Sequence, residues 1–244
     1  MKSLTFTLIL SVFLYSCQPQ LNSDPVFEPG TQTHQSFKAE AGLDYLLYLP
    51  ENYDPGKEGG FPTILFLHGA GERGDSLDVL TAWGPPRIAQ EKGLPFIVIS
   101  PQCPTNEWWT SMLSPLKGVL DEAISVYNID TTRIYLTGLS MGGYGTFAFS
   151  QVHPEYFAAV APICGGGTPS MLNFYTQPPT WVFHGDEDKI VPIESSQIMV
   201  DAMKAAGGEV KFTIYEGVDH YSFERAYNES GLFDWFLKHQ KKLP

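Results

Sequence analysis

The chain has 244 residues, of which 43% are hydrophobic and 17% are charged, and its formal net charge is −12 at pH 7. This length suits one domain of ordinary size, and the composition is that of a folded protein rather than a disordered chain. The excess of acidic side chains argues against nucleic acids and anionic lipid headgroups as partners, because both would be repelled.

The N-terminal residues carry a targeting pattern. Lys2 is followed by an apolar run from Leu4 to Leu14, which is shorter than the roughly 20 residues that span a bilayer but suits a secretory signal peptide. The sequence "LYSC" that ends at Cys17 resembles the signal of bacterial lipoproteins. That resemblance implies removal of residues 1–16, a lipid on Cys17 and a chain anchored to a bacterial membrane outside the cytoplasm. An ordinary cleaved signal peptide, which gives a secreted chain, is the alternative.

The rest of the chain divides into a tether and one domain. Residues 17–34 are polar and rich in Pro and Gly, as in a linker between an anchor and a domain. Residues 35–244 contain no internal repeat and no sign of a second domain. Apolar runs that indicate strands recur along them, at residues 45–50, 61–69, 95–101, 133–138, 157–166, 179–185 and 210–217.

Helical patterns lie between these strands. Pro115–Tyr127 has one apolar stripe and a natural N-cap at Ser114, and Ile193–Ala206 stops at a pair of glycines. Residues 141–154 and Leu232–His239 also have helical patterns. Alternating strands and helices predict the α/β class, with a mostly parallel sheet covered by helices on both faces.

Ser140 lies between one of these strands and the helix that follows. Gly138-Leu139-Ser140-Met141-Gly142 matches the G-x-S-x-G nucleophile elbow, a strand-to-helix turn so sharp that side chains two residues either side of the serine would collide. The helix N-terminus then presents amide N–H groups to developing negative charge. The pattern predicts that Ser140 is a nucleophile.

A nucleophilic serine needs a base and an acid that orients the base. Of six histidines, His220 lies just past the last predicted strand, where a loop can bring it over Ser140. The loop after the preceding strand offers three carboxylates, at Asp186, Glu187 and Asp188. A surface histidine and a carboxylate that caps its own loop are the structural alternatives.

Three stretches, "LHGAGERG", "GLSMGG" and "HGDEDKIVP", resemble the α/β-hydrolase family. The resemblance implies the α/β-hydrolase fold and selects Asp188 as the acid, so that Ser140, Asp188 and His220 follow the chain order of that fold. It also implies one oxyanion-hole donor at the backbone N–H of Ala70, with Gly71 as the alternative.

The second oxyanion donor is expected to be the backbone N–H of Met141, directly after the nucleophile. We assign the histidine of the "HG" turn, His68, to structure rather than chemistry. For Glu72 and Arg73 we expect an ion pair that braces the loop, with substrate contact as the alternative.

Besides Cys17 the chain has only Cys103 and Cys164. Two buried thiols are the default expectation and a disulfide is the alternative, because an oxidising compartment would permit one. No clustered Cys and His spacing points to a metal site, and the chemistry inferred below needs no cofactor.

More narrowly, "LHGAGERGD", "SPQCP" and "APICGGG" look like single-domain secreted esterases and predicted peptidases near the dienelactone hydrolases, phospholipase/carboxylesterases, feruloyl esterases and prolyl oligopeptidases. The resemblance implies a serine hydrolase that cleaves carboxylic esters. A peptidase of the prolyl oligopeptidase type and a non-catalytic binding protein on the same fold are the alternatives. The spacing between Cys164 and Trp181 leaves room for a minimal lid or none, which favours an open cleft.

Aromatic side chains near the predicted cleft suggest its substrate. Trp108 and Trp109 could stack on an aromatic acyl group or a sugar ring, and core packing is the alternative. The same two readings apply to Trp83, Tyr221 and Phe223. A small-molecule or carbohydrate-linked ester, cleaved outside the cytoplasm, is the expected substrate. The oligomeric state is left open.

Overall fold

A computed structural model describes residues 27–36, 42–172 and 177–242. The predicted signal peptide at residues 1–16 and the predicted lipid-attachment site at Cys17 lie outside the described residues.

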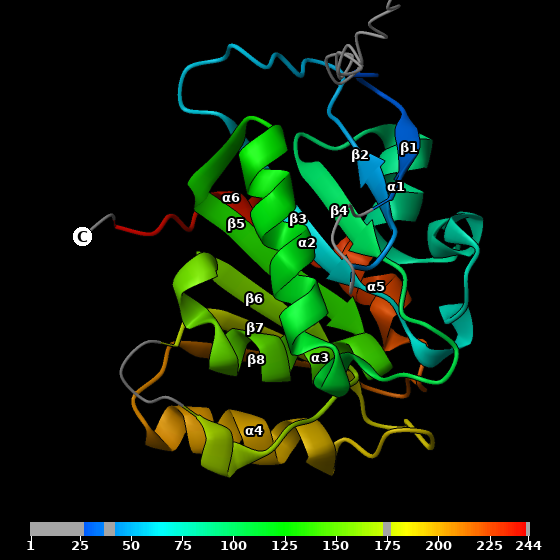
Figure 1. The fold of residues 1–244 in the computed structure, drawn as a ribbon. Helices are drawn as coiled ribbons and strands as arrows, with labels where there is room; N and C mark the ends of the chain where they lie inside the picture. Colours follow the sequence, from blue (N-terminus) through cyan, green and yellow to red (C-terminus); the bar gives the residue numbers. More distant parts are fainter. Residues whose placement is uncertain (1–26, 37–41, 173–176, 243–244) are drawn as a thin grey trace, which may run out of the picture.

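The described residues build one eight-stranded sheet in the order β1-β2-β4-β3-β5-β6-β7-β8 (Figure 1). Its first two strands are antiparallel to their neighbours, and all other neighbouring pairs are parallel. The seven predicted strands are all present, and the predicted α/β-hydrolase architecture is confirmed. The strands are β1 (Gln32–Gln35), β2 (Tyr45–Tyr48), β3 (Phe61–Leu67), β4 (Ile97–Pro101), β5 (Ile129–Leu139), β6 (Ala159–Ile163), β7 (Thr180–Gly185) and β8 (Val210–Tyr215).

The ordered domain begins earlier than the sequence suggests. β1 pairs with β2, with Gln32 opposite Tyr48, although residues 32–34 of β1 fall in the stretch expected to be a tether. Phe27 packs its ring 5.3 Å from that of Tyr53. β1 is only partly buried and is mostly polar, so it has no apolar pattern by which it could be recognised.

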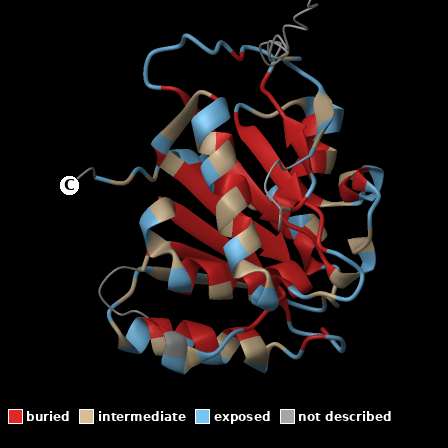
Figure 2. Ribbon diagram, in the orientation of Figure 1, coloured by how far each residue is buried: buried red, intermediate tan, exposed pale blue. Residues whose placement is uncertain are grey.

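Helices cover both faces of the sheet; β2, β3, β4, β6 and β7 are buried throughout, whereas the edge strands β1 and β8 are partly exposed (Figure 2). One face carries α2 (Leu113–Val126), α3 (Met141–Val152) and α4 (Glu194–Ala205). The other carries α1 (Gly84–Lys92), α5 (Ser222–Glu229) and α6 (Leu232–Leu237). Each face has its own hydrophobic core, as the predicted two-sided covering requires.

The helix boundaries differ slightly from the predicted ones. α2 begins at Leu113 and has Met112 at its N-cap, so Ser114 lies inside the first turn instead of capping it. α1 and α5 are not evident from the sequence. α1 opens on Gly84-Pro85-Pro86, which reads as a turn, because Gly and Pro are both poor helix formers in isolation.

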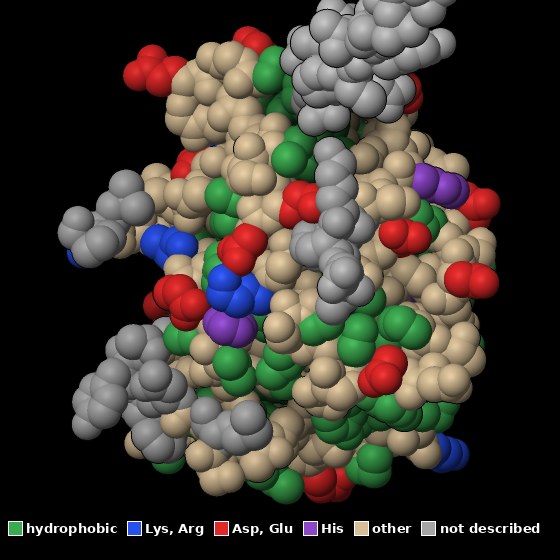
Figure 3. Space-filling model, in the orientation of Figure 1, with side chains coloured by type: hydrophobic (Ala, Val, Ile, Leu, Met, Phe, Trp, Pro, Cys, Tyr) green, Lys and Arg blue, Asp and Glu red, His purple; other side chains and the backbone are tan. Residues whose placement is uncertain are grey.

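The surface of the described residues fits the acidic composition. In Figure 3 acidic side chains are scattered over the face covered by α2, α3 and α4, with few basic ones among them. Among the described residues, no helix has the length and apolar character needed to cross a membrane.

Candidate active site

Ser140 occupies the sharp turn between β5 and α3. Its backbone has φ 55° and ψ −116°, a conformation that residues other than glycine rarely adopt. A Cβ on Gly142 would lie 1.9 Å from the carbonyl oxygen of Leu67, and one on Gly138 would lie 2.4 Å from the carbonyl oxygen of Gly142. Both glycines are therefore required by direct backbone contact, as the elbow pattern predicts.

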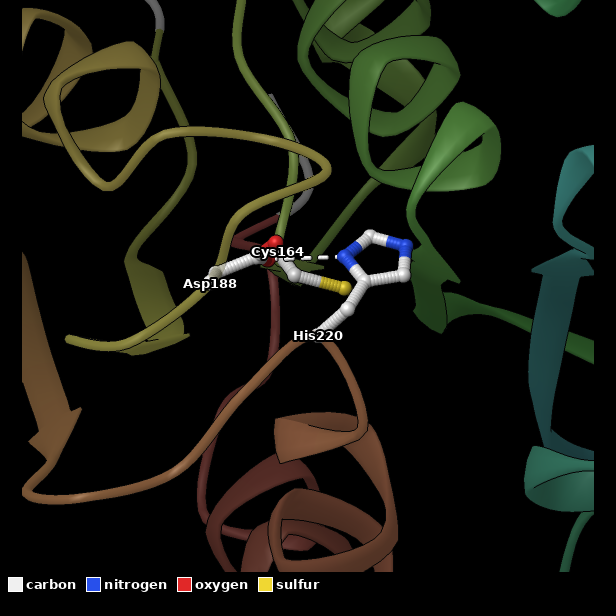
Figure 4. A group of neighbouring side chains, drawn as sticks. All are labelled: Cys164, Asp188 and His220. Atoms are coloured by element: carbon white, nitrogen blue, oxygen red, sulfur yellow. Dashed lines mark hydrogen bonds and ion pairs between the residues drawn. The ribbon is translucent and has the colours of Figure 1, made fainter.

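Two loops bring His220 and Asp188 to this turn. Asp188 follows β7, and His220 lies between β8 and α5. His220 Nε2 lies 2.9 Å from Ser140 Oγ, and His220 Nδ1 lies 2.7 Å from Asp188 Oδ2. Figure 4 shows the carboxylate and the imidazole from their separate loops, with the second ring nitrogen turned away from Asp188. The structure thus brings the three predicted side chains into one hydrogen-bonded chain.

The Asp188 carboxylate is fully buried and saturated with donors. Its Oδ1 accepts the backbone N–H groups of Ile190 and Val191, both at 2.9 Å. Burial alone would raise the pKa of Asp188, but the hydrogen bonds from His220 and from these two amides outweigh it and lower the pKa. The carboxylate is therefore ionised at neutral pH and can stabilise an imidazolium.

The expected oxyanion donors come from two adjacent elements. Met141 is the first residue of α3, so its N–H has no acceptor within the helix. Ala70 opens a single 3-10 turn, Ala70–Glu72, directly after β3. Ala70 and the alternative donor Gly71 line the same pocket of about 260 Å³ as Ser140 and His220.

Two buried side chains hold the oxyanion turn from below. His68 Nδ1–H donates to Gly69 O at 2.7 Å, and its Nε2 accepts the N–H of Cys103 at 3.0 Å. Burial lowers the pKa of His68 to about 4, so its ring is neutral and structural, as predicted. The indole N–H of Trp109 donates to His68 O at 2.9 Å.

No ion pair joins Glu72 to Arg73 in the part of the chain that the structure describes, so the expected brace is of another kind. Arg73 Nε donates to Ala70 O at 3.1 Å, and its guanidinium stacks over the Trp108 ring at 5.2 Å. The Glu72 carboxyl is half-buried beside Trp83. Each residue braces the turn through a different partner.

The tentative substrate contacts need correction. Trp109 is fully buried beneath the oxyanion turn and cannot reach a ligand, and Trp108 is half exposed against Arg73, outside the pocket lining. The lining of the pocket contains instead aromatic and aliphatic side chains from two other loops and the start of α5: Trp83, Ile190, Tyr221 and Phe223. For the three aromatic residues the sequence analysis left two possibilities open, contact with the substrate and packing in the core. Ile190 was missed, although an apolar residue two positions beyond the acid is a usable signal.

Cys164 lies next to the triad and Cys103 lies away from it. Both are free thiols, and they belong to the cores on opposite faces of the sheet, so no disulfide joins them. Donor atoms of Cys164, Asp188 and His220 lie within 4.8 Å of one another (Figure 4). Burial raises the pKa of Cys164 to about 12, which keeps it a neutral thiol, and the other two groups are engaged with each other. This cluster is therefore a poor metal site as it stands.

Two known proteins with similar sequences are described as acetylxylan esterases. The chain is 31% identical over 168 residues to a bifunctional acetylxylan esterase/xylanase of Neocallimastix patriciarum, which covers 66% of this chain and 24% of that protein. It is 27% identical over 203 residues to acetylxylan esterase A of Talaromyces purpureogenus, which covers 74% of this chain and 50% of that protein. The chain thus spans half or less of the length of these relatives.

The solved structure of a thermostable esterase superimposes with a TM-score of 0.75 and 34% identity, over 86% of this chain and 63% of that chain. The sequence pattern of one family, described as the dienelactone hydrolase family, matches residues 105–236. That stretch is more than half of the chain and contains Ser140, Asp188 and His220. The chain therefore belongs to the dienelactone hydrolase family.

Proposed function

We propose that this protein is a serine hydrolase that cleaves carboxylic esters, with Ser140 as nucleophile, His220 as base and Asp188 as the acid that orients it. The observation that carries the proposal is the continuous hydrogen-bonded chain from Ser140 Oγ through His220 to Asp188, at 2.9 and 2.7 Å. Ser140 lies at the N-terminus of α3, where backbone N–H groups favour negative charge.

The reaction follows from this arrangement in two stages. His220 Nε2 takes the proton of Ser140 as Oγ attacks the ester carbonyl, and Asp188 stabilises the imidazolium. The amides of Met141 and Ala70 stabilise the oxyanion, and loss of one such donor typically costs about 3 kcal/mol of transition-state stabilisation. His220 then protonates the leaving alcohol, and water hydrolyses the acyl-enzyme by the same route.

The direct test is hydrolysis of 4-nitrophenyl acetate by the wild type and by Ser140→Ala. We expect the substitution to reduce kcat on the order of 10⁶-fold, as loss of a triad nucleophile does elsewhere. A fluorophosphonate probe should label the wild type at Ser140 and leave the variant unlabelled. A folded S140A protein with full turnover on every ester would contradict the mechanism.

We propose further that the natural ester is an acyl group on a carbohydrate. Both relatives named above are acetylxylan esterases by description. The pocket is small and has an open aromatic rim at Trp83 and Tyr221, a surface on which a sugar ring can stack. A panel of acetylated xylo-oligosaccharides, feruloyl esters, alkyl esters and matched aminoacyl amides tests this. Faster turnover of the amides than of the matched esters would favour a peptidase instead.

We propose that the chain acts outside the cytoplasm and is held to a bacterial membrane by a lipid on Cys17. The "LYSC" pattern supports this, and two or more acyl chains would make the attachment stable. Expression with radiolabelled palmitate in a bacterial host should label the wild type and leave Cys17→Ala unlabelled. An unlabelled wild type that is secreted into the medium would instead indicate an ordinary signal peptide.

A further inference from the structure

A second imidazole reaches the Asp188 carboxylate from inside the protein. His184, the penultimate residue of β7, is fully buried, and its Nε2 lies 3.2 Å from Asp188 Oδ2, the oxygen that His220 also contacts. The same Nε2 lies 2.9 Å from the carbonyl oxygen of Val191. The chemistry proposed above makes no use of this group.

The surroundings of His184 decide where its proton lies. Burial outweighs the attraction of Asp188 and lowers the pKa of His184, so the ring is neutral. Nε2 faces two acceptors, Val191 O and Asp188 Oδ2, and must therefore carry the proton. The Ser196 hydroxyl lies 2.8 Å from both Nδ1 and the carbonyl oxygen of Gly165, so its single proton serves one of these two acceptors at a time.

The far side of His184 is tied to the helix that carries the nucleophile. Ser196, in α4, is fully buried and also lies 2.8 Å from the carbonyl oxygen of Gly165. Gly165 packs directly on Gly143 of α3, since a Cβ on Gly165 would lie 2.5 Å from the Gly143 carbonyl carbon. His184 thus links the acid loop after β7 to the backbone beneath Ser140.

We infer that His184 is a positioning residue for the proposed hydrolysis: its Nε2–H, which donates to Val191 O at 2.9 Å, also reaches Asp188 Oδ2 at 3.2 Å and fixes the carboxylate in the orientation that His220 requires. The inference rests on the proposed function. The partial positive charge of the His184 Nε2–H, placed beside the carboxylate, also weakens the attraction of Asp188 for the proton of His220. The titratable groups that face His184 are Asp188 and His220, with the Cys164 thiol next to both.

Two amide substitutions separate this role from simple packing. In His184→Gln the amide nitrogen reaches the place of Nε2 and can still donate to Asp188, whereas in His184→Asn it reaches only the place of Nδ1. We expect H184N to lower kcat about tenfold, the effect of one lost hydrogen bond to a charged group, and to raise the pKa of the acid limb of the kcat/KM profile by about half a unit. H184Q should stay within about threefold and keep the wild-type acid limb.

Ser196→Ala is the matched control, because it removes the partner of Nδ1 without touching the carboxylate. It should lower the Tm and leave the acid limb unchanged. Folded H184N and H184Q with the same acid limb as the wild type would overturn the inference, even if both are slower. The proposed function is tested separately by Ser140→Ala, which should lose activity whatever the His184 variants do. Failure of the His184 inference can therefore be told apart from failure of the proposed function.

A measurement on the unaltered protein covers the case in which H184N does not fold. Nitrogen NMR of histidine-labelled protein, with the His184 signal identified by its loss in H184Q, reports which ring nitrogen is protonated. We expect the Nε2–H form between pH 6 and 8. The Nδ1–H form would overturn the inference, because Asp188 Oδ2 would then face a bare nitrogen.

Discussion

Two glycine-rich turns meet at Ser140, and their glycines serve different purposes. In the elbow, a Cβ on Gly142 would lie 1.9 Å from Leu67 O, so glycine is the only residue that fits. In the oxyanion turn, a Cβ on Gly71 would meet no atom within 4 Å. The elbow is fixed by contact with backbone atoms, whereas the oxyanion turn meets side chains at Gly69 and open space at Gly71, and relies on side chains for support.

The two turns are therefore held in place by different kinds of contact. The elbow residues 138–142 contain no ionisable group, and their conformation follows from the contact of β5 with α3 and β3. The oxyanion turn is held by Trp109 through His68, by Arg73 on Ala70 O, and by Glu72 beside Trp83. Substitutions in the elbow should therefore cost the most stability, whereas those in the supports should cost less stability or change the activity.

The largest effect is expected from Gly142→Ala. The added methyl would overlap Leu67 O and force β3 and α3 apart, at a cost of about 3 kcal/mol or more. Chemical denaturation measures it. Gly71→Ala is the matched control for stability and should stay within about 0.5 kcal/mol of the wild type. Equal stability of the two variants would mean that the elbow is not fixed by this contact.

Trp109→Phe should have the next largest effect. It keeps most of the ring but removes the N–H that donates to His68 O, which leaves a buried carbonyl without this partner. We expect a loss of about 1–3 kcal/mol in the free energy of unfolding. Trp108→Phe, at a half-exposed position, should change it by less than about 0.5 kcal/mol. A Trp109 variant as stable as the Trp108 variant would remove Trp109 from the supports of the turn.

The elbow could be predicted from the sequence because its cause is local. Five consecutive residues contain the glycines, the nucleophile and the helix start, and the strands before and after show plain apolar patterns. The partners His220 and Asp188 were reachable because parallel strands place their carboxyl ends at one edge of the sheet. The choice of Asp188 over its neighbours still needed the family resemblance.

The supports of the oxyanion turn could not be predicted, because their partners are distant in the chain. Trp108 and Trp109 are neighbours in sequence, yet one is half exposed and the other fully buried, and only the packing of α3 and β3 decides which. Glu72 and Arg73 are likewise adjacent, but besides the nearby Ala70 O the partners of Arg73 are the carbonyl oxygen of Glu107, 34 residues away, and the ring of Trp108. Adjacent opposite charges suggested an ion pair that the three-dimensional fold replaces with other contacts.

A smaller effect is expected from Arg73→Ala. Loss of the guanidinium frees Ala70 O, which lies in the peptide directly after the Ala70 N–H, so the turn that presents this oxyanion donor can move, and kcat should fall about tenfold with little change in KM. Steady-state kinetics on 4-nitrophenyl acetate measure it. Arg225→Ala is the control, since Arg225 pairs with Glu229 and stacks on Tyr215 away from the turn. If both variants retained wild-type kcat, the hydrogen bond to Ala70 O would have no part in positioning.

The smallest effect is expected from Glu72→Gln and appears only as a pH dependence of stability. Burial raises the pKa of Glu72, and hydrogen bonds from the backbone and Trp83 do not fully offset it. A carboxyl whose pKa is raised in the folded state binds more protons there than in the unfolded chain. The wild type should therefore lose stability as the pH rises from the pKa of Glu72 in the unfolded chain through its pKa in the folded protein. The loss should be less than about 1 kcal/mol, because the carboxyl is only half-buried. The glutamine variant lacks this slope, so the Tm of the wild type minus that of the variant should fall between pH 4 and 7. A constant difference would show that the Glu72 carboxyl is as well solvated in the turn as in the unfolded chain.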